Sequence, residues 1–355
     1  MAFTTINDPS KYFHIQLYNG NGSTQAITND ANAGDFQPDW LWSKSRNDGF
    51  DNITRDSSRG ADARLLTHSD AAEGGATGTA SFDSDGFTLD STNTVNKASD
   101  NYVAWQWKAN GGTTSTLTAG TNIDTTVQAN TTAGFSIITY TGTGTDNDSI
   151  AHGLGAVPHF FIIKNRDETN GWQIYHQGNT SDPETDVVTL NTANATTDND
   201  TVFSDAAPSA TVITLGTNDG VSKANVKYVC YAFTEKQGYS RFGHYIGNGT
   251  TDGAFVYTGF KPAWLMVKEV VSGGGWGIWD NKRQTFNSAG TVNRLLANSS
   301  NAEDASNDNR IDFLSNGFKV RTSSGGFNQN ATNVLYIAFA ESPFVSSTGV
   351  PSTAI

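Results

Sequence analysis

The chain of 355 residues carries a net charge of −13, and only 16% of its residues are charged, against about 25% in ordinary soluble proteins. Its 22 basic residues form no block among the 35 acidic ones. We therefore expect neither a nucleic-acid partner nor an anionic membrane surface, since both attract positive charge. No run approaches the roughly 18 apolar residues of a membrane span, which predicts no membrane insertion. The single cysteine, Cys230, excludes a disulfide framework and a cysteine zinc site within one chain.

The first twelve residues, 1–12, precede every repeated pattern. Their sequence, "MAFTTINDPSKY", has neither the basic region nor the apolar region of a signal peptide. We interpret it as an N-terminal docking segment. An ordered strand of the first repeat is the alternative interpretation.

From residue 13 onward, five sequence blocks recur three times in the same order. They are a Tyr with a Gly-rich turn, a Pro followed by an apolar strand and Lys, a Gly with an aromatic residue and Ile, a short apolar strand, and a closing strand. A "GF" strand precedes the closing strand in copies one and three. Such self-similarity indicates repeated structural units. The copies are marked by Tyr18, Tyr140 and Tyr245, by Pro38, Pro158 and Pro262, and by Lys44, Lys164 and Lys268.

The strand patterns and the copy length predict the fold class. The closing run "NYVAWQW" alternates between two faces, as a strand does, and each copy of about 100 residues has the size of a small β-sandwich. "PHFFIIK" and "PAWLMVK" are continuously apolar, as in a strand covered on both faces. We predict an all-β fold of three tandem β-sandwich repeats of the jelly-roll or lectin-like kind. The expected boundaries are 13–110, 134–236 and 237–344, with a Thr- and Gly-rich linker at 111–133 and a tail at 345–355. Within the linker, "NIDTTVQA" could form an edge strand.

No catalytic motif stands out in the sequence. The spacings H-E-x-x-H and G-x-S-x-G are absent. The few Glu residues do not align across the copies, so no carboxylate pair is marked for glycoside hydrolysis. We expect no enzyme activity and no cofactor.

One acidic loop partly resembles a calcium site. Asp304 and Asp308 alternate with Ser306, as ligands do in an EF-hand loop. Asn309, however, occupies the position where that loop requires Gly, and Ser315 the position where it requires Glu. Calcium ligation by Asp304 and Asp308 is one interpretation, and a solvated turn is the other.

The aromatic residues give the candidate binding residues. Trp172 and Trp276 recur at equivalent positions, which is typical of core residues. Exposed aromatic rings next to Asp or Asn suit sugars, whose C–H faces stack on them. We select four residues as candidate surface contacts: Trp279 and Asp280 in the third copy, with their counterparts Tyr175 and His176 in the second.

Several motifs together resemble a known family. They include "LYNGNGSTQAITND", "FQPDWLWSKSRN", "NYVAWQWKANGGTTS", "HGLGAVPHFFIIKNRD" and "YIAFAESPF". This series covers nearly the whole chain and is similar to repeat-containing virion proteins of marine tailed bacteriophages, described as tail-fibre-like or receptor-binding, with lectin-like β domains. The resemblance implies a phage structural protein, located in the tail or on the capsid surface after assembly in the host cytoplasm. It carries over no catalytic or binding residues.

Three functional hypotheses follow from these patterns. The first is a tail-fibre or tail-tip protein whose loops contact a host-surface glycan or receptor. The second is a capsid decoration or tail-sheathing protein that binds only other virion proteins. The third is a polysaccharide depolymerase. Fibres of this kind are commonly trimeric, and oligomerisation covers the edge strands of sandwiches, so we expect a homotrimer.

Overall fold

The computed structural model shows a protein built almost entirely of antiparallel β-sheets, with helices of a single turn. The prediction of an all-β fold is therefore confirmed. No helix within the described part of the chain is long and apolar enough to cross a membrane. The structure describes residues 4–30, 35–75, 77–118, 122–284, 287 and 289–351.

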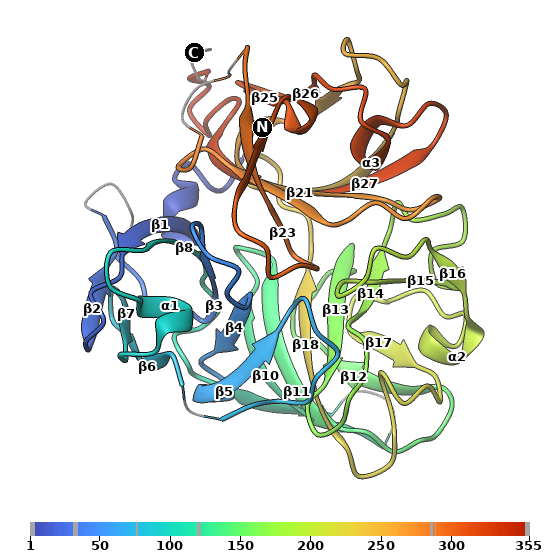
Figure 1. Ribbon diagram of the computed structural model, residues 1–355. Coiled ribbons are helices and arrows are strands. Elements are labelled where there is room, and N and C mark those ends of the chain that lie inside the picture. The colour runs from blue at the N-terminus through green and yellow to red at the C-terminus, as the bar shows by residue number, and fades with distance from the viewer. Residues whose placement is uncertain are drawn as a thin grey trace.

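The first lobe, residues 13–107, packs a five-stranded sheet of order β1-β8-β3-β4-β5 against a three-stranded sheet of order β2-β7-β6. It is coloured blue to cyan in Figure 1. The 3-10 turn η1 precedes it. The elements are η1 (Pro9–Lys11), β1 (Phe13–Asn19), β2 (Gln25–Thr28), β3 (Trp40–Ser45), β4 (Ile53–Asp56), β5 (Gly60–Leu66), β6 (Thr79–Asp83), β7 (Gly86–Leu89), α1 (Asn93–Asn96) and β8 (Asn101–Trp107).

The second lobe, residues 115–233, has an eight-stranded sheet of order β16-β15-β14-β13-β18-β11-β10-β9 and a two-stranded sheet, β12-β17. The elements are β9 (Ser115–Thr118), β10 (Asp124–Asn130), β11 (Phe135–Thr141), β12 (Asp148–Ala151), β13 (Phe160–Asn165), β14 (Gln173–His176), β15 (Asp186–Thr189), β16 (Thr197–Asp198), α2 (Asp200–Phe203), β17 (Val212–Leu215) and β18 (Lys227–Phe233).

The third lobe, residues 240–343, has a six-stranded sheet of order β19-β27-β21-β22-β23-β24 and a three-stranded sheet, β20-β26-β25. The elements are β19 (Ser240–Ile246), β20 (Phe255–Tyr257), β21 (Phe260–Glu269), β22 (Gly277–Asp280), β23 (Val292–Leu296), β24 (Asp304–Ser306), η2 (Asn307–Asn309), β25 (Ile311–Leu314), β26 (Gly317–Val320), α3 (Gly325–Asn328) and β27 (Asn333–Pro343).

The three larger sheets share one strand order and one register. In each, the first strand pairs with the closing strand, which pairs with the apolar strand of the second block, followed by two further strands. Equivalent residues can therefore be assigned from the pairing alone. Trp107, Phe233 and Phe339 are equivalent, each opposite Trp40, Phe160 or Trp264, and these in turn lie opposite Asp56, His176 or Asp280.

Each larger sheet is buried on both faces. One face packs inside its own lobe, and the other faces a central core that all three lobes share. Trp40 of the first lobe stacks on Tyr231 of the second with ring centroids 4.5 Å apart, and Trp107 meets Trp264 of the third at 5.7 Å. This double burial explains why the strands of the second block are continuously apolar.

The Tyr and Gly of the first block fix an equivalent turn in each lobe. The Tyr hydroxyl donates to a backbone carbonyl more than seventy residues away in sequence, at 2.5–2.9 Å. The Gly two residues later has a carbonyl oxygen where a Cβ would stand, so only Gly fits. The hydroxyl pairs are Tyr18–Val95, Tyr140–Val221 and Tyr245–Phe327, and the glycines are Gly20, Gly142 and Gly247.

The Lys of the second block is fully buried in each lobe and donates to backbone carbonyls. In two lobes one acceptor lies in the preceding lobe, because Lys164 donates to Asp70 and Lys268 to Ala193. Desolvation lowers the pKa of Lys44, Lys164 and Lys268 to about 8. Lys164 and Lys268 thus join neighbouring lobes, and none of the three side chains faces solvent.

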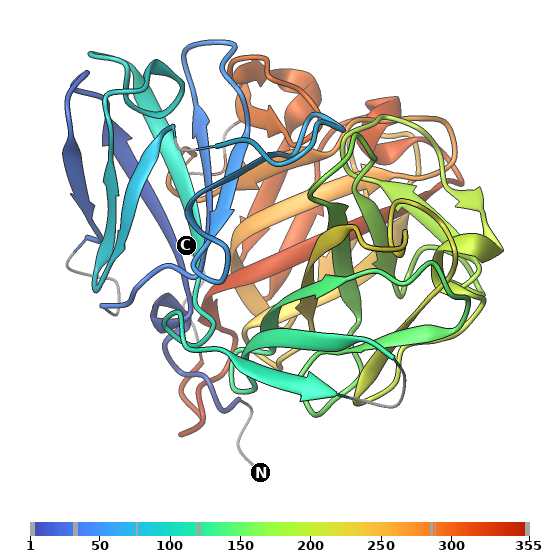
Figure 2. The same ribbon diagram turned by 90° about the horizontal axis from the view of Figure 1, so that it is seen from below.

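Residues 111–133 are not a plain linker, which corrects the expectation from composition. They contain β9 and β10, which extend the second lobe's sheet beyond β11. Figure 2 shows these blue-green strands at the edge of the lobe. Val127 packs into the lobe's own core, and Gln128 is fully buried. Low charge and abundant Thr suit an exposed strand as well as a flexible connection, so composition alone does not separate the two.

The segment expected to dock, residues 1–12, is described from residue 4 onward, and it contains η1 rather than a strand. Thr4 and Ile6 are buried, and the Thr4 hydroxyl donates to the Gln237 carbonyl at 2.7 Å. Asn7 accepts a hydrogen bond from the Ser347 amide at 2.8 Å. The segment thus joins the first lobe to the start of the third and to the tail. Its docking role remains a prediction, and the last residues of the expected tail, 352–355, lie outside the described residues.

Candidate functional site

Three polar contacts at equivalent positions join the lobes into a closed ring. Each is made by the residue that ends β4, β14 or β22, which reaches the closing strand of a neighbouring lobe. The contacts are the Asp56 carboxylate with the Tyr231 hydroxyl at 2.7 Å, the Asp280 carboxylate with the Trp105 indole N–H at 3.0 Å, and the His176 Nε2 with the Tyr336 carbonyl at 3.2 Å. We call them the interlobe bonds.

The carboxylate of the interlobe bond between the third and first lobes is neutralised by a buried arginine. The Arg283 guanidinium lies 2.6 Å from Asp280 and 3.0 Å from Glu303, and Glu303 in turn forms a bidentate pair with Arg46 of the first lobe. Burial alone lowers the pKa of Arg283, but the two carboxylates outweigh it and raise that pKa. The first lobe repeats this arrangement with Arg59, Asp56 and Glu73.

The third interlobe bond uses a histidine in place of the ion pair. His176 is fully buried, and desolvation lowers its pKa to about 4. The ring is therefore neutral at pH 7, with its Nε2 hydrogen pointing to the Tyr336 carbonyl.

The four candidate surface contacts are all buried, so the expectation that they are exposed is wrong. Trp279 is 2% exposed and donates to the Asn309 carbonyl inside the third lobe, and Tyr175 is 5% exposed and stacks on Phe161 in the second. Asp280 and His176 form interlobe bonds. Trp279 and Tyr175 lie on the face of the larger sheet that packs inside their own lobe, whereas Asp280 and His176 lie on the face that the other lobes cover.

The lobes differ at the outer edge of the first strand of each larger sheet. Ile15, Ile137 and Phe242 are equivalent there, as their pairing with the closing strand shows. In the second lobe β10 pairs along this edge, with Gln128 opposite Ile137. In the third lobe side chains cover it: the Phe242 amide donates to Glu235 at 2.8 Å, and its carbonyl accepts from Gln177 at 2.5 Å.

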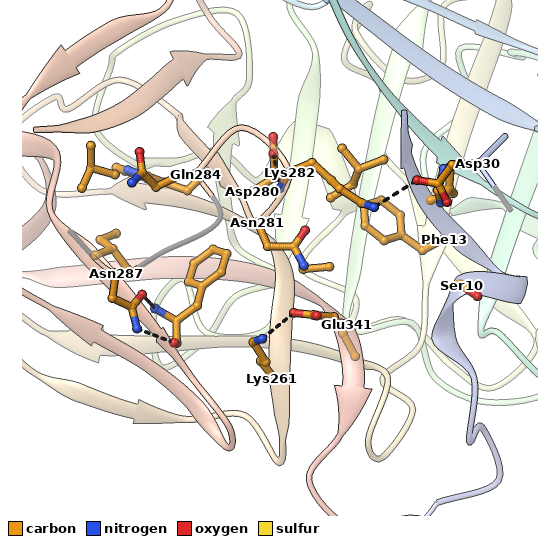
Figure 3. A pocket seen from close by; sticks show the side chains of 18 of the residues that line it. Ser10, Phe13, Asp30, Lys261, Asp280, Asn281, Lys282, Gln284, Asn287 and Glu341 are labelled. Atoms are coloured by element: carbon orange, nitrogen blue, oxygen red, sulfur yellow. Dashed lines mark hydrogen bonds and ion pairs between the residues drawn. The ribbon is translucent and has the colours of Figure 1, made fainter. Parts of the chain in front are cut away.

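In the first lobe the same edge borders an open cavity of about 690 Å³. Phe13, His14 and Ile15 of β1 form one side, and Asn281 and Lys282, which follow β22, form the other. β1 is the edge strand of its sheet in the described part of the chain. Figure 3 shows the labelled side chains around this space, which lies between the first and third lobes.

The rest of the cavity wall comes from two extended strands, which the other lobes lack in the described residues. β21 begins before Pro262, whereas β3 and β13 begin after the equivalent proline, and the extension contains a bulge between Lys261 and Trp264. Lys261 and Ala263 of this bulge line the cavity, together with Glu341 of the correspondingly extended β27. β-bulges often occur beside functional sites, where they redirect side chains.

The two lysines of the cavity wall are each paired with a carboxylate of the same wall. The Lys282 ammonium lies 3.1 Å from Asp30, and the Lys261 ammonium lies 3.0 Å from Glu341 (Figure 3). Between the two pairs lies Asn281, whose buried Oδ1 accepts no hydrogen bond from the described residues. An uncharged ligand that offers a hydrogen-bond donor suits this wall better than an ion of either sign.

A metal at Asp304 and Asp308 gains no support from the geometry. Asp304 pairs with Arg294 at 3.0 Å, and its backbone carbonyl accepts from Asn309. No group of three or more His, Cys, Asp or Glu side chains in the described residues could hold a metal ion. Calcium binding at this loop remains a prediction.

Of the residues that line the cavity, the sequence analysis selected only Trp279 and Asp280, both of which are buried in the cavity wall. The signals were present but weak. "GFKPAW" places a charged residue, Lys261, before the strand's proline, where the other copies have the uncharged residues Gln37 and Val157. Asn281 follows the aspartate in the position of Ser57. Only the pairing of strands shows that these differences meet in one place.

In the described residues, the chain is an all-β protein of three lobes that contact one another in a ring, with a cavity between the first and third lobes. The chain belongs to the family described as a domain of unknown function, DUF7483, whose sequence profile matches residues 8–343. No curated protein and no solved structure matches the chain.

Proposed function

We propose that the chain is a non-catalytic structural protein of a phage particle, a tail-fibre or tail-tip component that contacts the host surface through the interlobe cavity. The single observation that carries this proposal is the convergence at one place of the features that break the threefold pattern. Among the described residues, an open strand edge, a bulged strand and an unpartnered amide oxygen all meet there. In the other two lobes the equivalent edge is covered by the chain itself.

Non-catalytic binding fits the chemistry of the cavity. Asp30 and Glu341 are each held by a lysine, and Asp280 accepts hydrogen bonds on both oxygens from Trp105, Arg283 and the Lys282 amide. Paired carboxylates of this kind are not poised as the acid and base of a glycosidase. A depolymerase is therefore the least favoured of the three hypotheses, and release of reducing sugar from host envelopes would support it.

A structural role limited to virion partners is the second candidate. The edge of β1, open in the described residues, favours it, because unpaired backbone groups at a strand edge can pair with another chain. In that case the cavity holds a segment of another particle protein, and the isolated chain does not bind cells.

Binding of the purified chain to intact host cells tests the proposal. We expect saturable binding that depends on the cavity, measured with fluorescently labelled protein and with excess envelope polysaccharide as one competitor. A folded chain that binds no host cells would overturn the attachment role and favour the capsid or tail-sheathing alternative.

A further inference from the structure

The strand edge in the cavity has an internal precedent. Equivalent positions in the second lobe show what such a space holds when it is filled: β10 lies between β11 and the first lobe's residues Ser57 and Ser58. The Gln128 side-chain amide donates to the Ser57 hydroxyl at 3.0 Å and to the Ser58 hydroxyl at 2.9 Å. An extended strand with a central amide side chain thus occupies this position.

The cavity presents the same surroundings without the strand. Asn281 and Lys282 are the equivalents of Ser57 and Ser58, because they follow the equivalent residues Asp280 and Asp56. Asn281 is thus the equivalent of Ser57, whose hydroxyl accepts from Gln128, and its Oδ1 is a buried acceptor without a donor in the described residues. The missing donor is the one that a strand like β10 would bring.

The backbone of β1 also presents its hydrogen-bonding groups to the cavity. Gly20 donates to Asp100 and Lys108 donates to Tyr12, so the even-numbered residues of β1 bond to β8. Alternate residues of a strand face opposite neighbours, which directs the N–H and C=O of Phe13 and Ile15 toward the open side. The equivalent Phe242 has both of these groups bonded by side chains.

We propose that the cavity accepts an extended segment of a host-surface partner protein, which adds as an antiparallel strand to β1 and donates an amide side chain to Asn281. This inference rests on the proposed function and names its partner's chemistry. The segment is uncharged where it lies between the two ion pairs, because both lysines are already neutralised. It carries Gln or Asn opposite Ile15, as β10 does opposite Ile137.

A second copy of the chain does not supply this segment from its β10. That strand is paired on both sides, with β9 and with β11, in its own lobe. Donating it would require opening the second lobe's sheet. A polypeptide partner with a free extended segment meets the geometry without that cost, and main-chain pairing at a sheet edge is a common mode of peptide recognition.

A synthetic peptide of the chain's own β10 sequence, residues 124–130, is the probe. We expect saturable binding of the labelled peptide to the full-length protein by fluorescence anisotropy. N-methylation of the residue equivalent to Gln128, whose N–H faces the acceptor, should weaken binding by on the order of tenfold or more. N-methylation of the residue equivalent to Val127, which faces away, is the matched control and should have little effect. Replacing the glutamine by leucine should weaken binding in wild type but not in Asn281→Leu.

The outcomes separate this inference from the attachment role. Absence of peptide binding would overturn strand addition. Equal binding of the peptides N-methylated at the residues equivalent to Gln128 and Val127 would overturn it too. If the protein nevertheless binds host cells and soluble polysaccharide displaces it, the cavity is a glycan site and the attachment role stands. Peptide binding with the expected N-methyl pattern but no binding to cells would support strand addition and overturn host attachment.

Discussion

The carboxylate of Asp56 accepts a 2.7 Å hydrogen bond from the hydroxyl of Tyr231, which lies in the next lobe of the ring. The same carboxylate holds Arg59 at 2.5 Å, and both side chains are fully buried. Each lobe's larger sheet thus makes an interlobe bond to a residue that is distant in sequence. The three lobes depend on one another, and we expect them to unfold together.

Breaking this interlobe bond should destabilise the whole ring. Asp56→Asn leaves Arg59 buried with a weakened partner, and loss of one member of a buried ion pair typically costs about 3–5 kcal/mol. Tyr231→Phe keeps the ion pair but removes two hydrogen bonds, one to Asp56 and one from Arg59, and should cost about 1–3 kcal/mol. Urea unfolding followed by tryptophan fluorescence gives both values. A separate early transition in Asp56→Asn, with the other lobes unaffected, would argue against a cooperative ring.

Substitution of the turn glycines by alanine should destabilise the fold far more than the same substitution at an exposed glycine. Gly20→Ala, Gly142→Ala and Gly247→Ala each place a methyl group against a backbone carbonyl, and overpacking of this kind costs about 1–3 kcal/mol or more. Gly75→Ala is the matched control, because nothing lies within 4 Å of its added Cβ. Thermal unfolding of the four variants should separate Gly75→Ala from the rest.

Acid should weaken the ring through His176. Its pKa is about 4 in the folded chain, against 6.5 for an exposed histidine ring, so the unfolded chain binds more protons between these pH values. Stability is therefore present above pH 6.5 and lost as the pH falls toward 4, by about 1.4 kcal/mol per pH unit within this window. His14, His152 and His159 have lowered pKa values and act in the same direction. His176→Gln should flatten the pH profile of the unfolding free energy, and an unchanged slope would contradict the role given to this ring.

Mild alkali should stabilise the fold, because the three buried lysines have pKa values near 8 in the folded chain, against 10.5 for an exposed lysine. Between pH 8 and 9 the unfolded chain binds more protons, so the unfolding free energy should rise with pH. Burial raises the pKa of Cys230 and of Tyr239, which reverses the trend at higher pH. Unfolding at pH 9 should take up roughly two protons, and Lys164→Met should reduce that uptake by about one. A flat or falling stability between pH 8 and 9 would show that these lysines are not desolvated.

Much of the fold could be predicted from the sequence because its repeated residues have local roles. The Tyr of the first block, its Gly and the buried Lys each satisfy one backbone requirement, which recurs wherever the strand order recurs. The ring could not be predicted, since Trp40 contacts Tyr231 and Trp107 contacts Trp264 across lobes, and no sequence period encodes which lobe faces which. The burial of Trp279 and Tyr175 has a different cause, because both side chains pack in the cores of their own lobes.

The proposed site depends on differences between the copies, and on residues other than those selected from the sequence. Conspicuous aromatic residues mark the cores. The cavity instead depends on Ile15, whose backbone N–H and C=O face the open edge of β1 and whose apolar side chain is not distinctive in sequence. It also depends on the side-chain amide of Asn281, a residue type that is abundant in this chain. Edge position is a property of the sheet, and it becomes visible only when β10 is seen to cover Ile137 and not Ile15.

Cell binding by a chain with a blocked cavity tests the central claim most directly. Asn281→Trp fills the space between β1 and the third lobe, and Val271→Trp, at a position 58% exposed and away from the cavity lining, is the matched control. Both variants should unfold at the same urea concentration as the wild type. We predict that Asn281→Trp loses at least tenfold in affinity for host cells, equivalent to about 1.4 kcal/mol, while Val271→Trp binds normally. Equal binding by the two variants would contradict the assignment of host contact to this cavity.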